Sequence, residues 1–129
     1  MPTAKGPFEV KTTPLDGDTD VDGVIMGRLA LDKIYEGDLQ GVGVGQMQTT
    51  GGPSGAGVYV ALERVTGTLA GRKGSFVLVH RGVMTKTSRD LSIAIAPDSG
   101  TGGLAGISGT FSIEIVDGKH GYSLDYKLG

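Results

Sequence analysis

The stretch Gly67-Thr-Leu-Ala-Gly-Arg-Lys-Gly-Ser-Phe76 returns thirty-five positions later as Gly102-Gly-Leu-Ala-Gly-Ile-Ser-Gly-Thr-Phe111, with six of the ten positions identical. Each copy leads into a run of β-forming residues, which are Phe76–His80 after the first and Phe111–Ile115 after the second. A glycine-dense turn followed by such a run is typical of antiparallel sheet. The two copies therefore indicate one structural unit used twice.

The rest of the chain predicts an all-β fold of about eight strands with little or no helix. Turn signals rich in glycine, proline and aspartate separate the runs. Glycines at 41, 43 and 45 leave one face of their run as bare backbone, which suits close approach of a neighbour. The expected strands lie near Phe8–Thr12, Val24–Tyr35, Leu39–Thr50, Val58–Leu69, Ser75–Val83, Leu91–Ala96, Thr110–Val116 and Tyr122–Leu128.

A meander of short strands forms either a sandwich or a barrel. A barrel removes exposed sheet edges. It also explains runs that are apolar on both faces, because one face lines the interior and the other meets a partner subunit or a terminal segment. A sandwich would need more polar outer faces than the two central runs have. We therefore predict a single antiparallel β-barrel of eight strands over residues 1–129, with residues 1–6 and 14–23 flexible.

Composition excludes several classes of function. A chain of 129 residues without cysteine is one domain that has no disulfide or thiolate metal site. Its two histidines, His80 and His120, are too few for an all-histidine metal site, and its net charge of −2 gives no reason to expect nucleic acid as a partner. No stretch approaches the roughly 20 apolar residues of a membrane span, and the start of the chain lacks a secretory pattern. We expect a cytoplasmic protein with no cofactor, no metal and no membrane partner.

The register of the central hairpin follows from its turn. A loop of two residues at Gly71-Arg72, or of four around them, pairs Leu69 with Gly74 and sets Glu63 opposite His80. Side chains alternate between the two faces of a strand, so both groups share a face with aromatic and aliphatic side chains. Arg64 and Arg81 fall on the opposite, outward face, where salt bridging is expected.

The last hairpin has the stronger turn signal, Asp117-Gly118. A two-residue turn there sets Ile113 opposite Tyr122 and Phe111 opposite Leu124. The repeat equates Phe76 with Phe111, so the face that carries Glu63 and His80 is predicted to point inward. The residues on these two inward faces are Tyr59, Ala61, Glu63, Val65, Gly67, Phe76, Leu78, His80, Phe111, Ile113, Ile115, His120, Tyr122, Leu124 and Tyr126.

Glu63 and His80 form the sharpest candidate for chemistry. Burial raises the pKa of a carboxyl and lowers that of an imidazole, while their mutual attraction acts in the opposite direction. Such a pair can transfer protons near neutral pH. The functional interpretation is a catalytic acid/base pair that lines a cavity. The structural interpretation is a cross-strand pair that satisfies itself.

The remaining candidates would bind substrate. A tyrosine hydroxyl can orient a polar atom, although tyrosines also fill barrel interiors as core. His120 follows a tight turn, which favours a place at the rim. The predicted substrate-binding residues are Tyr59, Phe76, Leu78, Phe111, Ile113, Tyr122 and Tyr126.

Two binding motifs are incomplete. Asp18-Thr-Asp20-Val-Asp22-Gly23 matches the first half of a calcium loop, but the position that should hold a bidentate glutamate is Leu29. The interpretation is a solvated acidic loop, with calcium as the alternative. The glycine-rich stretch 100–106 does not match a nucleotide-binding pattern, and no strand–helix context surrounds it.

Three segments resemble an uncharacterised bacterial family, a domain of unknown function with an allene-oxide-cyclase-like β-barrel. They are Tyr59–His80, Ser99–Gly106 and the ending His120–Tyr126. The resemblance covers roughly residues 6 to 128. It implies an eight-stranded antiparallel barrel that is often oligomeric, and it implies no established activity. Other barrels of this type bind reactive small molecules and steer their cyclisation or coupling, but this analogy transfers no catalytic residue.

The sequence therefore supports three hypotheses. The first is an isomerase or cyclase that acts on a small apolar or aromatic molecule without a cofactor. Glu63 would be its base or charge stabiliser, His80 its proton relay, and Tyr59 or Tyr126 its orienting donor. The second is a carrier that binds such a molecule without changing it. The third is a filled barrel that acts through self-assembly, and a homo-oligomer is expected in each case.

Overall fold

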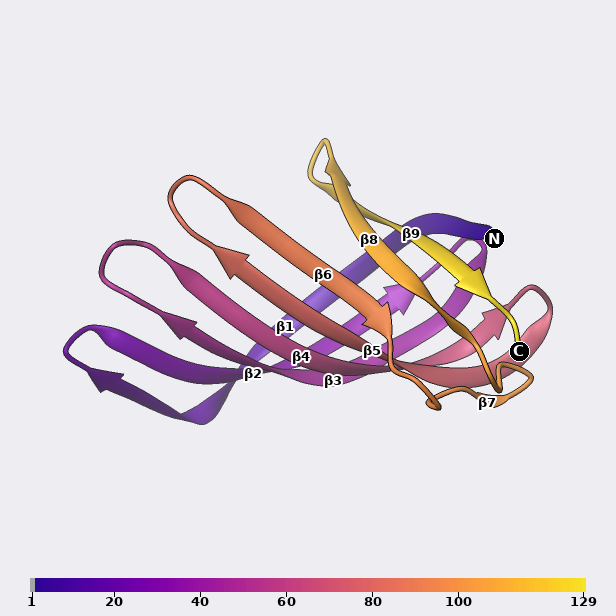
Figure 1. The fold of residues 1–129 in the computed structure, drawn as a ribbon, viewed down its shortest axis with the longest axis horizontal. Coiled ribbons are helices and arrows are strands. Elements are labelled where there is room, and N and C mark those ends of the chain that lie inside the picture. Colours follow the sequence, from indigo (N-terminus) through magenta and orange to yellow (C-terminus); the bar gives the residue numbers. More distant parts are fainter. Residues whose placement is uncertain (1) are drawn as a thin grey trace.

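A computed structural model describes residues 2–129, which form nine antiparallel strands and no helix (Figure 1). Eight of the strands are long, and seven of these fall within a few residues of the predicted runs. The strands are β1 (Thr3–Val21), β2 (Val24–Tyr35), β3 (Leu39–Gly51), β4 (Gly57–Leu69), β5 (Arg72–Met84), β6 (Arg89–Ile95), β7 (Thr101–Gly102), β8 (Ser108–Val116) and β9 (Lys119–Lys127).

The sheet closes into a ring. Its strand order is β4-β3-β2-β1-β9-β8-β6-β5, and β4 pairs in turn with β5, which leaves no end strand among the eight. The two-residue strand β7 pairs with Gly74 and Ser75 of β5, ahead of the stretch of β5 that pairs with β6. The predicted class, an antiparallel all-β sheet that closes on itself, is confirmed.

The ring is tight at one end and splayed at the other. Strand β1 pairs with β9 only over Thr3–Pro7, and β6 pairs with β8 only at Ile93 and Ala94. Beyond these short seams the hairpins separate. Figure 1 shows the β1–β2, β3–β4, β5–β6 and β8–β9 turns projecting away from the end that holds both chain termini. Backbone pairing therefore closes the ring only near the end that holds the termini.

The closed end contains the hydrophobic core. Leu39 and Leu69 are fully buried there, beside Leu104 and Ile107 from the segment between β7 and β8. Aromatic rings from β1, β2, β8 and β9 continue the core toward the middle, where Phe8, Tyr35, Phe111 and Tyr122 contact one another. Among the described residues there is no helix long and apolar enough to cross a membrane.

The two repeat copies fold differently, which corrects the expectation of one unit used twice. In the first copy β4 turns directly into β5, and these two strands pair with each other. In the second copy β7 pairs with β5, and β8 pairs with β6 and β9. The shared residues serve as anchors for the core, since Leu69 and Leu104 are both buried, as are Phe76 and Phe111.

The acidic segment 14–23 is not a loop, which corrects a second expectation. Strand β1 runs through it to Val21, with an irregularity between Leu15 and Thr19, and Asp22-Gly23 forms the hairpin turn. Aspartate has a low propensity for strands. The backbone hydrogen bonds with β2 hold the segment extended despite this propensity. Strand β1 also covers most of the N-terminal segment 1–6, of which residue 1 lies outside the described residues.

Candidate functional site

A fully buried carboxylate lies at the centre of the ring. Glu63 of β4 accepts hydrogen bonds on both of its oxygens. Its Oε1 lies 2.9 Å from Nε2 of His80 and 3.0 Å from Nζ of Lys33, and its Oε2 accepts from the hydroxyl of Tyr35 at 2.5 Å. Lys33 and His80 are also buried, with exposed fractions of 4% and 3%. We call these four residues the Glu63 network.

Strand pairing brings the network together. The β4–β5 hairpin turns at Ala70-Gly71, one position earlier than predicted, so Glu63 is opposite Leu78 and His80 is opposite Ala61. The predicted register is therefore wrong by two residues. An even shift leaves every side chain on its predicted face. Glu63 and His80 become diagonal neighbours, a separation that long side chains span.

Strand β3 makes room for the carboxylate by lacking a side chain. Gly43 is buried between Lys33 of β2 and Val65 of β4, and a Cβ at this position would overlap the carboxylate of Glu63. The same Cβ would lie 3.1 Å from the ring of Tyr35. The row of glycines on β3 was predicted to allow close approach, and at position 43 the group that approaches is Glu63.

We expect Gly43→Ala to unfold at a lower denaturant concentration than the wild type. Its free energy of unfolding should fall by about 1–3 kcal/mol, because overpacking displaces the Glu63 network. Gly52→Ala is the matched control, since a Cβ there meets nothing within 4 Å. The measurement is equilibrium urea denaturation of the three proteins. Equal losses for the two variants would show that position 43 has no special contact.

The network holds Glu63 in its ionised form. Burial by itself raises the pKa of Glu63, but the hydrogen bond with His80, the charge of Lys33 and the hydrogen bond from Tyr35 outweigh burial, and the pKa lies below its ordinary value. Burial, and then the charge of Glu63, raise the pKa of the Tyr35 hydroxyl, which therefore remains a donor. A buried carboxylate with three donors is fully paired and satisfied.

The lowered pKa of Glu63 predicts an acid-dependent loss of stability. A carboxyl whose pKa is lower in the folded state contributes stability above its unfolded pKa, about 4.3, and loses it as pH falls through the folded value. We expect carbon-13 NMR of the Glu63 side chain to show a titration midpoint below about 4.3. A midpoint above that value would contradict the assigned donors.

A cavity of about 280 Å³ opens from the network toward the hairpin turns. Lys33 and His80 are at its inner end, and most of its other walls are apolar. Tyr59 is half-buried in the wall, and burial raises the pKa of its hydroxyl. The lining residues are Phe8, Val10, Thr12, Leu31, Lys33, Met47, Tyr59, Ala61, His80, Leu91, Ile113, Ile115 and His120.

The predicted site residues divide into two groups. His80, Tyr59 and Ile113 line the cavity, as does His120, while Glu63 lies behind it. The others predicted to bind substrate belong to the packed core: Phe76, Leu78, Phe111, Tyr122 and Tyr126.

Two of the core tyrosines have structural partners. The hydroxyl of Tyr122 donates to the carbonyl of Glu36 and accepts from the amide of Leu39, which holds the β2–β3 turn in place. Tyr126 pairs with Gly109 near the closed end. Of the two tyrosines considered as orienting donors, the cavity therefore contains Tyr59 and lacks Tyr126.

Two residues of the site were missed from the sequence, Lys33 and Tyr35. Their signal is the alternation of Leu31, Lys33 and Tyr35, which places the lysine on an apolar face of β2. The structure shows all three buried. The ammonium of Lys33 also lies 5.1 Å from the centre of the Phe8 ring, within the range of a cation–π contact.

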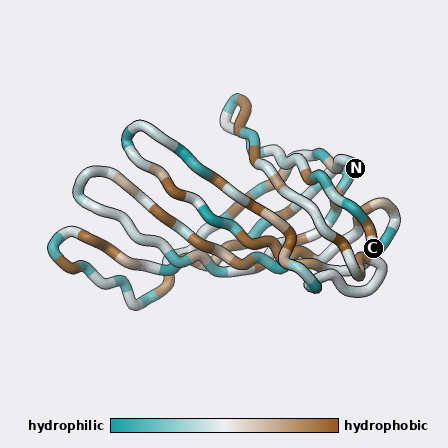
Figure 2. The backbone as a smooth tube through the Cα atoms, viewed as in Figure 1, coloured by the Kyte–Doolittle hydropathy of each residue, from teal (hydrophilic) through white to brown (hydrophobic). Residues whose placement is uncertain are grey.

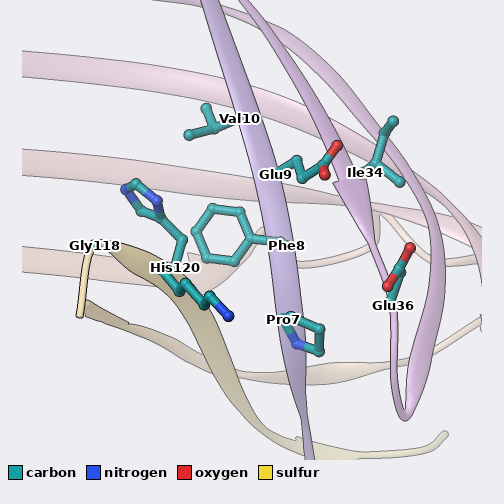
Figure 3. Close-up of a pocket in the computed structure, with 9 residues that line it drawn as sticks. Pro7, Phe8, Glu9, Val10, Ile34, Glu36, Gly118 and His120 are labelled. Atoms are coloured by element: carbon teal, nitrogen blue, oxygen red, sulfur yellow. The ribbon is translucent and has the colours of Figure 1, made fainter. Parts of the chain in front are cut away.

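A second hollow, of about 580 Å³, lies in the gap between β1 and β9 (Figure 3). Figure 3 shows the ring of Phe8 and the imidazole of His120 facing each other, and their centres are 5.3 Å apart. The hollow is bordered also by exposed Glu36 and Lys119. It shares Phe8, Val10 and His120 with the interior cavity, but neither Lys33 nor His80 lines it.

The aspartates of the calcium-like motif do not converge. Asp18 and Asp20 lie along the extended β1 arm, and the carboxylate of Asp20 accepts from the amide of Gly23 within its own turn. Among residues 2–129 no group of three or more histidine or acidic side chains is arranged to hold a metal ion.

Comparison with known proteins finds a family of unknown function. The family model described as "Protein of unknown function (DUF3224)" matches residues 4–126. A crystal structure of a DUF3224 protein of unknown function from Shewanella oneidensis MR-1 is 41% identical to this chain. The two superpose with a TM-score of 0.94, and the match covers 100% of this chain and 98% of that one. No curated protein matches the chain.

Proposed function

Since the chain belongs to the DUF3224 family of unknown function, we propose from its own residues that it binds a small, largely apolar carbonyl compound in the interior cavity and isomerises it by proton transfer. The observation that carries the proposal is a shared contact. His80 and Lys33 both line the cavity, and both contact the same oxygen of a buried glutamate. A ligand oxygen or an acidic C–H at the inner end therefore meets an imidazole and an ammonium side by side.

His80 is the proposed base. Glu63 is ionised and accepts a hydrogen bond from Nε2–H of His80, so the neutral ring carries its lone pair on Nδ1. Nδ1 has no hydrogen bond within residues 2–129, and these residues contain no buried side-chain nitrogen or oxygen without a partner. Nδ1 therefore borders open space, and His80 is among the residues that line the interior cavity.

Glu63 is the proposed charge stabiliser. Full burial and three donors leave it without a lone pair directed at a ligand, and its lowered pKa disfavours proton uptake. An imidazolium formed on His80 would be stabilised by the adjacent carboxylate, as in other histidine–carboxylate pairs. Of the two roles expected for Glu63, the contacts favour stabiliser over base.

The reaction is a shift of one double bond. Nδ1 of His80 removes a proton from the carbon between a carbonyl and an alkene. The C–H electron pair forms a new carbon–carbon π bond, and the carbonyl π electrons move to oxygen. An N–H of Lys33 stabilises this oxygen. The electrons on oxygen then re-form the carbonyl, the new π bond moves one carbon along, and the alkene π electrons take the proton back from His80 at the far carbon. The product is the conjugated isomer, with no net oxidation.

Two further features support the proposal. The buried charges of the network are costly to maintain, and a core of similar volume could be built from apolar side chains alone. The family that the sequence resembles is expected to have an allene-oxide-cyclase-like barrel, which adds an analogy of fold only.

The test uses cyclohex-3-enone as a probe in heavy water. The wild type should convert it to cyclohex-2-enone faster than buffer does, with deuterium incorporated at the carbon that accepts the proton, as measured by proton NMR. Binding of the probe without conversion would favour a carrier. No binding of the probe or its conjugated isomer would contradict both functions.

A further inference from the structure

The outer surface of strands β2 to β5 carries an apolar patch that the proposed function does not use. Six large side chains point outward there, with exposed fractions of 41% to 61%. Figure 2 shows hydrophobic segments, coloured brown, along the hairpins that these strands form. The residues of this outer apolar face are Ile34, Val42, Val44, Val60, Leu62 and Val79.

Strand register makes the patch continuous. Ile34 is opposite Val42 on neighbouring strands, and Leu62 is opposite Val79. A hollow of about 650 Å³ runs over the same surface, bordered by Leu62, Val79 and polar Gln46. Continuous apolar surface of this kind marks interaction sites on soluble domains.

The charges around the patch are arranged for self-complementarity. Asp32, Val44 and Arg64 form one row across three strands, because Val44 pairs with both of the others. All three are exposed, and neither charged group makes an ion pair within residues 2–129. Lys11 of β1 is opposite Asp32 on the side of β2 that is away from Val44. The acid and the arginine thus flank Val44 at one strand spacing each, about 5 Å.

We propose that the outer apolar face binds a second copy of this chain, face to face about a two-fold axis that runs along β3 past Val44. This axis places Asp32 of each copy against Arg64 of the other. A two-fold contact must be complementary to itself, and a row with opposite charges on either side of an apolar centre meets that condition. This surface is the outer side of the ring, so the inference is independent of the cavity.

The same axis explains the most exposed residue of the patch. Leu62 shares a row with Gln46 and Ala30, on the two strands that precede it in the sheet. Rotation about β3 sets Leu62 of one copy above Ala30 of the other, where a small side chain leaves space for it.

Sedimentation equilibrium tests this assembly. The wild type should be a dimer at micromolar concentration, and Leu62→Asp should be a monomer. Val116→Asp is the matched control, since Val116 is exposed to 63% but lies at the β8–β9 turn, and it should stay dimeric.

A charge exchange tests the proposed axis. Asp32→Arg and Arg64→Asp should each weaken the dimer at least tenfold, and the double variant D32R/R64D should restore it. A monomeric wild type, a dimer that survives Leu62→Asp, or a double variant weaker than both single variants would overturn the proposal. So would a trimer, since rotation by a third of a turn does not place Asp32 against Arg64.

Discussion

Glu63→Ala should cost about 3–5 kcal/mol of unfolding free energy, because it leaves the ammonium of Lys33 buried without its counter-charge. The hydroxyl of Tyr35 and Nε2 of His80 lose their acceptor in the same step. Equilibrium denaturation in urea measures the loss. Glu114→Ala is the control, since Glu114 is exposed on β8 and its removal should change stability by no more than about 0.5 kcal/mol.

A double variant separates the charge from the packing. Lys33→Met with Glu63→Leu removes both charges and keeps apolar volume, and we expect it to be more stable than Glu63→Ala alone. This comparison holds even if Glu63→Ala fails to fold. The loss of unfolding free energy in the double variant should be smaller than the sum of the losses in Lys33→Met and Glu63→Leu. A larger loss than that sum would contradict a paired buried charge.

His80→Gln should lower kcat/KM for cyclohex-3-enone by about 10²- to 10⁴-fold, the usual contribution of a positioned acid/base group. The amide of glutamine can still donate to Glu63, but it cannot accept a proton near neutral pH. Affinity for the product cyclohex-2-enone should stay within a few fold, because the apolar walls of the cavity are unchanged. NMR of the isomerisation and a titration with the product measure the two quantities.

Tyr126→Phe is the control for this prediction, since Tyr126 is buried outside the cavity. It should retain the wild-type rate. If His80→Gln also retains that rate, another group transfers the proton, and the assignment of His80 is wrong.

The sequence predicts well where the strands lie and which face of the sheet carries Glu63 and His80. Period-two alternation and turn residues are local signals. The Asp117-Gly118 turn sets Phe111 opposite Leu124 as expected. The β4–β5 hairpin differs from its predicted register because Ala70 takes a positive φ of 52°, a conformation that alanine seldom adopts. The resulting shift is even, so Glu63 and His80 still point into the ring.

The parts that could not be predicted depend on distant contacts. Lysine is almost never fully buried unless it is paired, so Lys33 gave no strong signal until Glu63 was placed beside it. Five residues predicted to contact substrate face inward but lie deeper than the cavity, among them Phe76 and Leu78. Alternation defines the face of a strand, whereas the depth of a cavity depends on how far the ring closes.

Intermolecular NOEs between bound cyclohex-2-enone and the protein test the site most directly. The expected contacts are to the methyl group of Met47, the ring of Tyr59 and the imidazole of His80, which line the interior cavity on three different strands. Contacts confined to Pro7 and Lys119 would place the ligand in the gap between β1 and β9 instead. That result would contradict a binding site built on the Glu63 network.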